Sequence, residues 1–239
     1  MSTNSSPNPS LNNSSPNNGI RGRVVVSWTG GKDGALSFYK AVQAGYQVSH
    51  LLHFKNARKQ GSHDINPHLL TFQAAALGVG MIQRDFLSYE EEFKRVVGDL
   101  RKQGARIDGA VFGHIETHKN LVDRICRDMD LELLMPLWNR DSNQIIAELI
   151  EAGFEVMVSS VKADLLGPEW LGRKIDRDFA GDLRRHDRAI DPCGENGEFH
   201  TFVTDGPLFK NRLKIAGSRT VLREGYWFLD VSEFESIEK

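Results

Sequence analysis

The chain has 239 residues, 40 % of them hydrophobic and 26 % charged, which are ordinary proportions for one globular domain or for one domain with a smaller companion. A formal net charge of −2 at pH 7 excludes a strongly basic surface, so neither nucleic acid nor an anionic membrane is an expected partner. The two cysteines, Cys126 and Cys193, lie far apart in the sequence, which argues against a disulfide framework. No apolar run approaches the roughly 18 residues that indicate a membrane-spanning helix.

The N-terminal segment is uncharged and rich in Ser, Asn and Pro. It lacks the basic start and the apolar centre of a secretory signal. A segment of this composition buries too little apolar surface to offset the entropy that is lost on ordering. The sequence therefore predicts a disordered tail over residues 1–21, and a cytoplasmic location is the default expectation.

Strand-like and helix-like patterns alternate through the first half of the chain. Short β-branched or apolar runs predict buried strands at 24–26, 48–54, 81–86 and 109–115. Apolar residues at helical spacing predict helices over 35–42, 67–77, 89–102 and 119–130. Strands that alternate with such helices imply right-handed crossovers, so we predict an α/β fold in which helices sandwich a parallel sheet.

The pattern loosens after Pro136. We expect a helix at 142–152 and strands at 154–161, 199–204 and 225–231, whereas the charged stretch 163–191 has no clear assignment. We therefore place a boundary near Pro136, between a first domain at 22–135 and a smaller α+β domain at 136–239.

A glycine-rich segment follows the first predicted strand and leads directly into a helix: Ser27-Trp28-Thr29-Gly30-Gly31-Lys32-Asp33-Gly34. Paired glycines allow a positive φ and let phosphate oxygens approach the backbone N–H groups, to which the helix N-terminus adds its own donors. Hydroxyls at Ser27 and Thr29 and the charge of Lys32 complete a predicted anion cradle. The P-loop pattern fails because Asp33 follows Lys32, and the dinucleotide pattern G-x-G-x-x-G is absent. The alternative is a structural turn in which the glycines only permit close packing.

A second segment, at residues 191–209, begins as a turn and continues as a strand. Its chemical groups are the thiol of Cys193, the carboxylates of Glu195 and Glu198, and the imidazole of His200. Such a set suits the positioning of an amine, the binding of Mg²⁺ or the transfer of a proton. The alternative is a solvated hairpin with Cys193 as a small buried hydrophobe.

Zinc is not expected. His114-x-Glu116 with Pro192-Cys193 is reminiscent of the zinc-deaminase pattern H-x-E…P-C-x-x-C, but Asn196 stands where the last cysteine belongs.

Both segments are similar to known enzymes. Thr29-Gly-Gly-Lys-Asp-Gly34 resembles the S-G-G-K-D-S loop of the N-type ATP pyrophosphatases, with a hydroxyl kept at Thr29 and one lost at Gly34. The run from Asp191 to Phe209 resembles the hallmark of one branch of that superfamily, the diphthine–ammonia ligase family. Pro136-Leu-Trp138 with Asp141, Leu171-Gly-Arg173 and Gly113 resemble further elements of the family, so the similarity extends from Val24 to Phe209.

The resemblance implies a Rossmann-like HUP fold, with an ATP-binding PP-loop domain at 22–135 and a substrate-binding domain at 136–239. It implies a ligase of diphthamide biosynthesis that uses ATP and Mg²⁺. The carboxylate of the acceptor, diphthine on an elongation factor 2-type protein or a small-molecule carboxylate, would be adenylated with release of pyrophosphate. Ammonia would then displace AMP. The oligomeric state is open, with a homo-oligomer as one option.

The resemblance also implies roles for individual residues. The ATP-binding residues would be Ser27, Trp28, Thr29, Gly30, Gly31, Lys32, Asp33, Gly34 and Gly113. The substrate-binding residues would be Cys193, Gly194, Glu195, Asn196, Gly197, Glu198 and His200. Catalytic roles would fall to Lys32, Asp33, Glu195 and Glu198, and Asp33 would bind the metal.

Two other functions compete with this one. A transferase that thiolates tRNA would need catalytic cysteines and a basic face, neither of which the composition supports. A non-catalytic nucleotide sensor similar to universal stress proteins is compatible with Gly34, but leaves the acidic run at 191–209 without a purpose.

Overall fold

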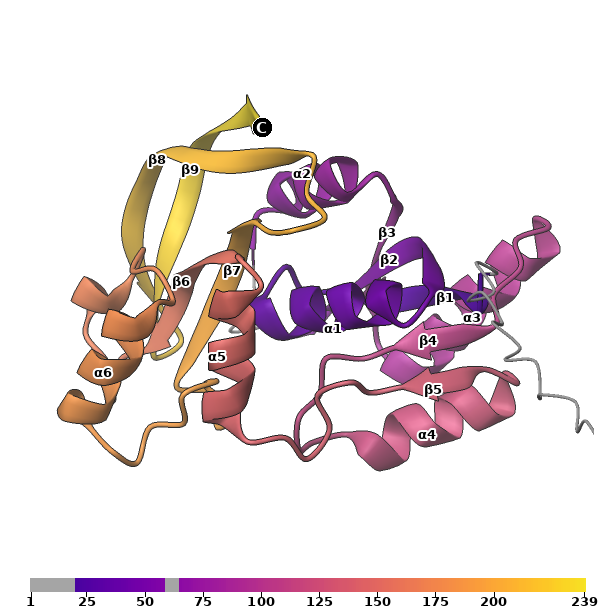
Figure 1. Cartoon of the computed structure of the whole chain (residues 1–239), viewed down its shortest axis with the longest axis horizontal. Helices are drawn as coiled ribbons and strands as arrows, with labels where there is room; N and C mark the ends of the chain where they lie inside the picture. The colour runs from indigo at the N-terminus through magenta and orange to yellow at the C-terminus, as the bar shows by residue number, and fades with distance from the viewer. Residues whose placement is uncertain (1–19, 59–64) are drawn as a thin grey trace, which may run out of the picture.

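The first half of the chain forms a five-stranded parallel sheet in the computed structural model, which describes residues 20–58 and 65–239 (Figure 1). Its strands are β1 (Gly22–Ser27), β2 (Tyr46–Asn56), β3 (Gly80–Phe86), β4 (Gly109–Val111) and β5 (Glu132–Leu134). The helices between them are α1 (Lys32–Gln43), α2 (Pro67–Leu77), α3 (Tyr89–Lys102) and α4 (Lys119–Asp128). The predicted α/β fold is confirmed, while the predicted tail at 1–21 lies, apart from its last two residues, outside the described part of the chain.

Helices cover both faces of this sheet because successive residues of a strand point to opposite sides. Val24 and Val26 of β1 belong to the apolar cluster that includes Leu36 on α1. Val25, between them, packs in a second cluster with Phe93 on α3. All three valines are fully buried, which explains why β1 is a continuous apolar run in the sequence.

The order of the strands, β3-β2-β1-β4-β5, creates a switch point beside β1. The chain moves outward from β1 through β2 and β3, and then crosses to β4 and β5 on the other side. Ligands of open α/β sheets bind at the carboxyl ends of the strands that flank such a point. β4 is shorter than predicted: it ends at Val111, and residues 112–115 leave the sheet at this edge.

The second half forms an antiparallel sheet in the order β7-β6-β9-β8, with strands β6 (Glu155–Lys162), β7 (Phe199–Asp205), β8 (Asn211–Arg223) and β9 (Tyr226–Glu238). Its helices are α5 (Ser142–Glu151), η1 (Pro168–Trp170) and α6 (Arg177–His186). The prediction missed β5 and β8. β8 is polar and mostly exposed, with Leu213 as its buried residue, and its extended conformation comes from pairing along its length with β9.

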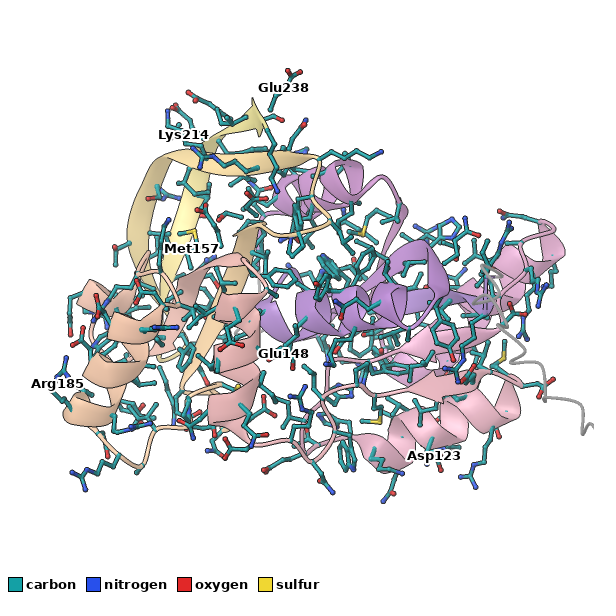
Figure 2. The ribbon with its side chains drawn as sticks, viewed as in Figure 1. Asp123, Glu148, Met157, Arg185, Lys214 and Glu238 are labelled. Carbon is teal, nitrogen blue, oxygen red and sulfur yellow. The ribbon has the colours of Figure 1, made fainter. Side chains whose placement is uncertain are left out.

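Helices from the two halves meet through an ion-pair cluster. Glu148 on α5 lies on the side of that helix that faces α1 (Figure 2). Its carboxylate accepts hydrogen bonds from Lys40 on α1 and from Arg140, both at 2.5 Å. The predicted boundary near Pro136 falls between β5 and α5.

The glycine turn, residues 27–34, lies against β7 at the N-terminus of α1 (Figure 1). The Gly30 carbonyl accepts a hydrogen bond from the Val203 N–H at 2.9 Å, and the Lys32 N–H donates to the Thr201 hydroxyl at 3.1 Å. The fully buried Gln73 amide donates to the carbonyls of Gly30 and Val203. Its oxygen accepts from the Trp28 indole at 2.8 Å. The second sheet therefore helps to set the conformation of the turn.

Gly30→Ala should lower the free energy of unfolding more than Gly104→Ala. Both glycines have a positive φ, 82° and 88°, so alanine in the left-handed region should cost about 1–2 kcal/mol at either position. A Cβ at Gly30 would lie 2.7 Å from Leu70 Cδ2, whereas none of the described atoms lies within 4 Å of a Cβ at Gly104. The crowding should add about 1–3 kcal/mol. Urea denaturation measures both values, and equal losses would contradict this account of the packing.

Candidate active site

A cleft of about 430 Å³ lies between the carboxyl ends of β1 and β4 and the turn that precedes β7. It unites most of the predicted site residues: Ser27, Thr29, Gly31, Lys32, Asp33, Gly34, Gly113, Cys193, Gly194, Glu195, Gly197 and His200. It also contains residues to which the sequence assigned no role, namely His114, Thr117, His118, Phe199 and Thr201. Phe199 and Thr201 lie within the predicted run at the start of β7, and the other three follow β4.

Gly113 brings β4 against the glycine turn. A Cβ at this position would lie 2.8 Å from the backbone carbon of Asp33 and from the nitrogen of Gly34, so only glycine permits this approach. Gly34 differs, because a Cβ there would meet its nearest neighbours at 3.6 and 3.7 Å. Serine would therefore fit at position 34, and its absence is a chemical departure from the family loop rather than a steric requirement.

Lys32 joins the glycine turn to the second half of the chain. The residue is only 3 % exposed, and its ammonium donates to Asp33 Oδ2 at 2.8 Å and to the carbonyl oxygen of Cys193. Burial alone lowers the pKa of Lys32, but the neighbouring carboxylates of Asp33 and Glu195 outweigh it and raise the pKa above its ordinary value. The ammonium is therefore charged inside the cleft.

Asp33 presents a free carboxylate oxygen beside this ammonium. Oδ1 is buried and has no hydrogen-bond partner among the described residues, while Oδ2 is bonded to Lys32. An oxygen of this kind suits a hard cation. Within residues 20–58 and 65–239 no group of three or more His, Cys, Asp or Glu side chains could hold a metal ion. A cation at Asp33 would therefore need further oxygens from a bound ligand.

The acidic turn, residues 191–198, is held by its own carboxylates. Asp191 Oδ1 accepts from the N–H groups of Cys193 and Glu195 at 2.7 and 3.3 Å. Glu198 accepts from the Asp191 N–H at 3.0 Å, and from the backbone and side-chain N–H groups of Asn196 at 2.9 and 3.0 Å. Gly194 and Gly197 supply positive φ angles of 73° and 80°. These hydrogen bonds fix the conformation of the turn, which is therefore not a solvated hairpin.

The two glutamates of this turn have different surroundings. Glu198, predicted to be catalytic, is 3 % exposed, lies outside the cleft and uses its carboxylate to hold the turn, which favours a structural role for this residue. Glu195 lines the cleft. Burial, together with the negative charges of Asp33, Asp191 and Glu116, raises the pKa of Glu195 to about 7 against the opposing effect of Lys32.

Three other predicted residues also lie outside the cleft. Asn196 is exposed. Trp28 packs edge-on against Phe38 in the core, and its indole is bonded to Gln73, so its side chain supports the turn from behind. The Gly30 carbonyl is already bonded to Val203 and Gln73. Trp28 and Gly30, predicted to bind ATP, and Asn196, predicted to bind the substrate, therefore do not line the cleft.

Cys193 and His200 line the second half of the cleft. The Cys193 sulfur donates to the Ser142 carbonyl at 3.5 Å, and burial raises the pKa of the thiol to about 12. It is therefore a neutral packing group at pH 7 and a poor nucleophile. The ring of His200 stacks on Tyr226, with centroids 6.0 Å apart.

Tyr89 of α3 supports the glycine turn from the first half. Its hydroxyl lies 3.0 Å from the Ser27 hydroxyl, and burial raises the pKa of Tyr89 to about 12. The phenol therefore stays protonated at neutral pH and fixes the orientation of Ser27 at the end of β1.

The fold and the cleft together define an α/β protein with a glycine turn at its switch point and an acidic turn, which precedes a strand of the second sheet, facing it. Two family models match this chain: the diphthamide synthase N-terminal domain over residues 22–133 and the diphthamide synthase C-terminal domain over residues 141–239. The chain belongs to the diphthamide synthase family. This result confirms the predicted family, and the names of the curated relatives, which are diphthine–ammonia ligases, confirm the predicted class of enzyme, a ligase.

Curated relatives agree with this assignment. The diphthine–ammonia ligase of Homo sapiens is 25 % identical over 90 % of this chain and 91 % of its own length. The diphthine–ammonia ligase of Danio rerio is 26 % identical over 87 % of this chain and 92 % of its own length.

Among solved structures, a predicted subunit of tRNA methyltransferase from Methanocaldococcus jannaschii is similar with a TM-score of 0.41 and 15 % identity, over 77 % of this chain and 99 % of that one. This likeness is too distant to carry an argument. No helix in the described part of the chain is long and apolar enough to cross a membrane.

Glu195→Gln and Glu198→Gln should change stability in opposite directions at pH 8. The folded-state pKa of Glu195, about 7, is above its ordinary value of 4.5. Folding therefore favours the protonated form, and the stability contributed by this group is lost as the pH rises through 7. A neutral glutamine removes this loss, so Glu195→Gln should raise Tm at pH 8 and much less at pH 5.

Glu198→Gln, in contrast, places an amide against N–H donors and should cost about 1–3 kcal/mol. Thermal and urea unfolding at pH 5 and pH 8 measure the stability of both variants relative to the unmodified protein. Destabilisation of Glu195→Gln at pH 8 would contradict the different surroundings of the two carboxylates.

Proposed function

We propose that this protein adenylates the carboxylate of diphthine on an elongation factor 2-type protein and then forms the amide with ammonia, releasing AMP and pyrophosphate. The observation that carries this proposal is the Lys32 bridge, which brings the glycine turn and the acidic turn into one cleft. An acyl-adenylate must be formed and consumed in one place, because holding the reactants together removes most of the entropic barrier. The family membership and the names of the relatives support the choice of acceptor and amine.

The glycine turn supplies the binding of the phosphates. Gly31 is the N-cap of α1 and has no side-chain cap. The Lys32 N–H is bonded to Thr201, so the following N–H groups of the first turn would bind an anionic ligand. The Lys32 ammonium beside it stabilises the charge that develops as pyrophosphate leaves. The buried Oδ1 of Asp33 would hold Mg²⁺ together with phosphate oxygens, and the ion would neutralise phosphate charge.

The acidic turn serves the transfer to ammonia. The nitrogen attacks the acyl carbon, a C–N bond forms, the bond from that carbon to the AMP oxygen breaks, and the nitrogen loses a proton. Glu195 is the carboxylate of this turn that faces the cleft, and a base with a pKa of about 7 suits the removal of that proton near neutral pH. The negative charges of Glu195, Asp191 and Glu116 also favour the quaternary ammonium of diphthine.

A small-molecule carboxylate is the alternative acceptor for the same chemistry. A nucleotide sensor is not favoured, because it would have no use for a buried lysine that links the nucleotide turn to an acidic turn. The cytoplasmic location and a homo-oligomer stay predictions.

With Mg²⁺-ATP, ammonium and diphthine-bearing elongation factor 2, the protein should release AMP and pyrophosphate in equal amounts, and only when the acceptor is present. Lys32→Met keeps the side-chain volume but removes the charge, and should lower this rate about 100-fold or more. Lys40→Met on the same helix breaks only the bond to Glu148 and should stay within about twofold. Chromatographic separation of AMP, ADP and ATP measures the rate of AMP release by the unmodified protein and by both variants. ADP as the product, or full activity in Lys32→Met, would overturn the proposal.

The rate of amide formation should rise about tenfold between pH 6 and pH 8 at a constant concentration of free ammonia. A base acts in its deprotonated form, and Glu195 with a pKa of about 7 is mostly protonated at pH 6 and mostly ionised at pH 8. Glu195→Gln should lower the rate about 100-fold and flatten this rise. The pH dependence of AMP release at saturating ATP and acceptor provides the measurement, and an unchanged slope in the variant would assign the titration to another group.

A further inference from the structure

Three side chains that line one wall of the cleft have no part in the chemistry described above. They are His114, Thr117 and His118, from the loop between β4 and α4. His118 is the N-cap of α4 and has a φ of 62°, a conformation that non-glycine residues adopt at a cost in energy and that is often found at functional sites. The loop is therefore held in a defined shape rather than left free.

His114 offers an unused polar atom in this wall. Its Nδ1 is buried and has no hydrogen-bond partner among the described residues. The ring is held by stacking on Phe112, with centroids 6.0 Å and planes 13° apart, and by the edge of His118 at 5.3 Å. Phe112 in turn stacks on Phe93 of α3. Buried polar atoms are nearly always paired. An unpaired nitrogen on a side chain that lines a cleft therefore points to a ligand as its partner.

The electrostatics indicate what kind of group this partner is. Burial, followed by the repulsion from His118, lowers the pKa of His114 to about 4, so the imidazole is neutral at pH 7. A neutral ring has no charge with which to attract a phosphate. It can, however, exchange a hydrogen bond with a hydroxyl group, as donor or as acceptor according to its tautomer.

The position of His114 indicates which group of the ligand would supply this hydroxyl. Gly113, the preceding residue, packs directly on the backbone of Asp33 and Gly34, so His114 follows immediately after the point where β4 meets the glycine turn. In ATP the ribose is the group attached to the phosphates. Given the proposed function, on which this step rests, we infer that His114 hydrogen-bonds a ribose hydroxyl of ATP and makes the enzyme select ribonucleotides over deoxyribonucleotides.

The test compares the binding of Mg²⁺-ATP, Mg²⁺-2′-deoxyATP and Mg²⁺-3′-deoxyATP at pH 7.5 by equilibrium dialysis without acceptor. The unmodified protein should bind one of the two deoxy nucleotides about tenfold more weakly than ATP, which identifies the hydroxyl. His114→Phe keeps a ring that can stack on Phe112 but loses the nitrogen. It should bind ATP about tenfold more weakly and no longer distinguish the three nucleotides.

Two further variants separate recognition from a structural effect. His114→Asn retains a polar atom near the place of Nδ1 and should restore part of the selectivity. His50→Phe is the matched control, because His50 Nδ1 is also buried and unbonded within the described residues but lies on β2, away from the cleft. It should select ATP as the unmodified protein does.

Equal binding of the three nucleotides by the unmodified protein, or persistent selectivity in His114→Phe, would overturn the inference. The proposed function fails separately: a protein that selects the ribose but releases no AMP with its acceptor would be a nucleotide binder and not this ligase. A protein that forms AMP without selecting the ribose would retain the function and lose the inference. Failure to bind ATP at all would overturn both.

Discussion

The buried ammonium of Lys32 is stable only because two turns that are far apart in the chain meet around it. Its acceptors are the adjacent Asp33 carboxylate and the carbonyl of Cys193, which lies 161 residues further on. A charge in the interior costs several kcal/mol unless it is paired and hydrogen-bonded. The second half of the chain therefore has to dock for the first half to bury its lysine, and the cleft forms as a consequence of that docking.

Backbone hydrogen bonds also make the conformation of the glycine turn depend on the second half of the chain. The glycine turn uses the Gly30 carbonyl and the Lys32 N–H to contact Val203 and Thr201 on β7, and Gln73 on α2 closes the arrangement from behind. A turn that was free to move would have to be ordered by each nucleotide that binds. Here its conformation is set during folding, which is the preorganisation that electrostatic catalysis requires.

Within the acidic turn, two carboxylates three residues apart have been given different properties by their surroundings. Glu198 is surrounded by N–H donors and holds the turn, whereas Glu195 faces a cleft that already contains Asp33 and has Asp191 nearby. Under the proposed function, their different surroundings parallel other active sites in which the environment assigns different tasks to chemically identical groups. The turn thus combines a stable part with a part that is destabilised in its charged form and available for chemistry.

The sequence by itself determined the parallel sheet, the limits of α2 and α3, and the two segments that carry the chemistry, because strand and helix periodicity and glycine placement are local properties. The three consecutive valines of β1 are one example, because an unbroken apolar run indicates a strand that is buried on both faces. β8 was missed for the complementary reason, since its polar residues become a strand only through pairing with β9.

The tertiary structure decided the use of each polar group. Nothing near Trp28 in the sequence reveals its hydrogen bond to Gln73, and nothing near Lys32 reveals its hydrogen bond to the carbonyl of Cys193. Thr201 and His114 line the cleft because β7 begins and β4 ends beside the glycine turn. Hydrogen-bond partners and electrostatic surroundings depend on residues that are tens to hundreds of positions apart, and only the packed fold brings them together.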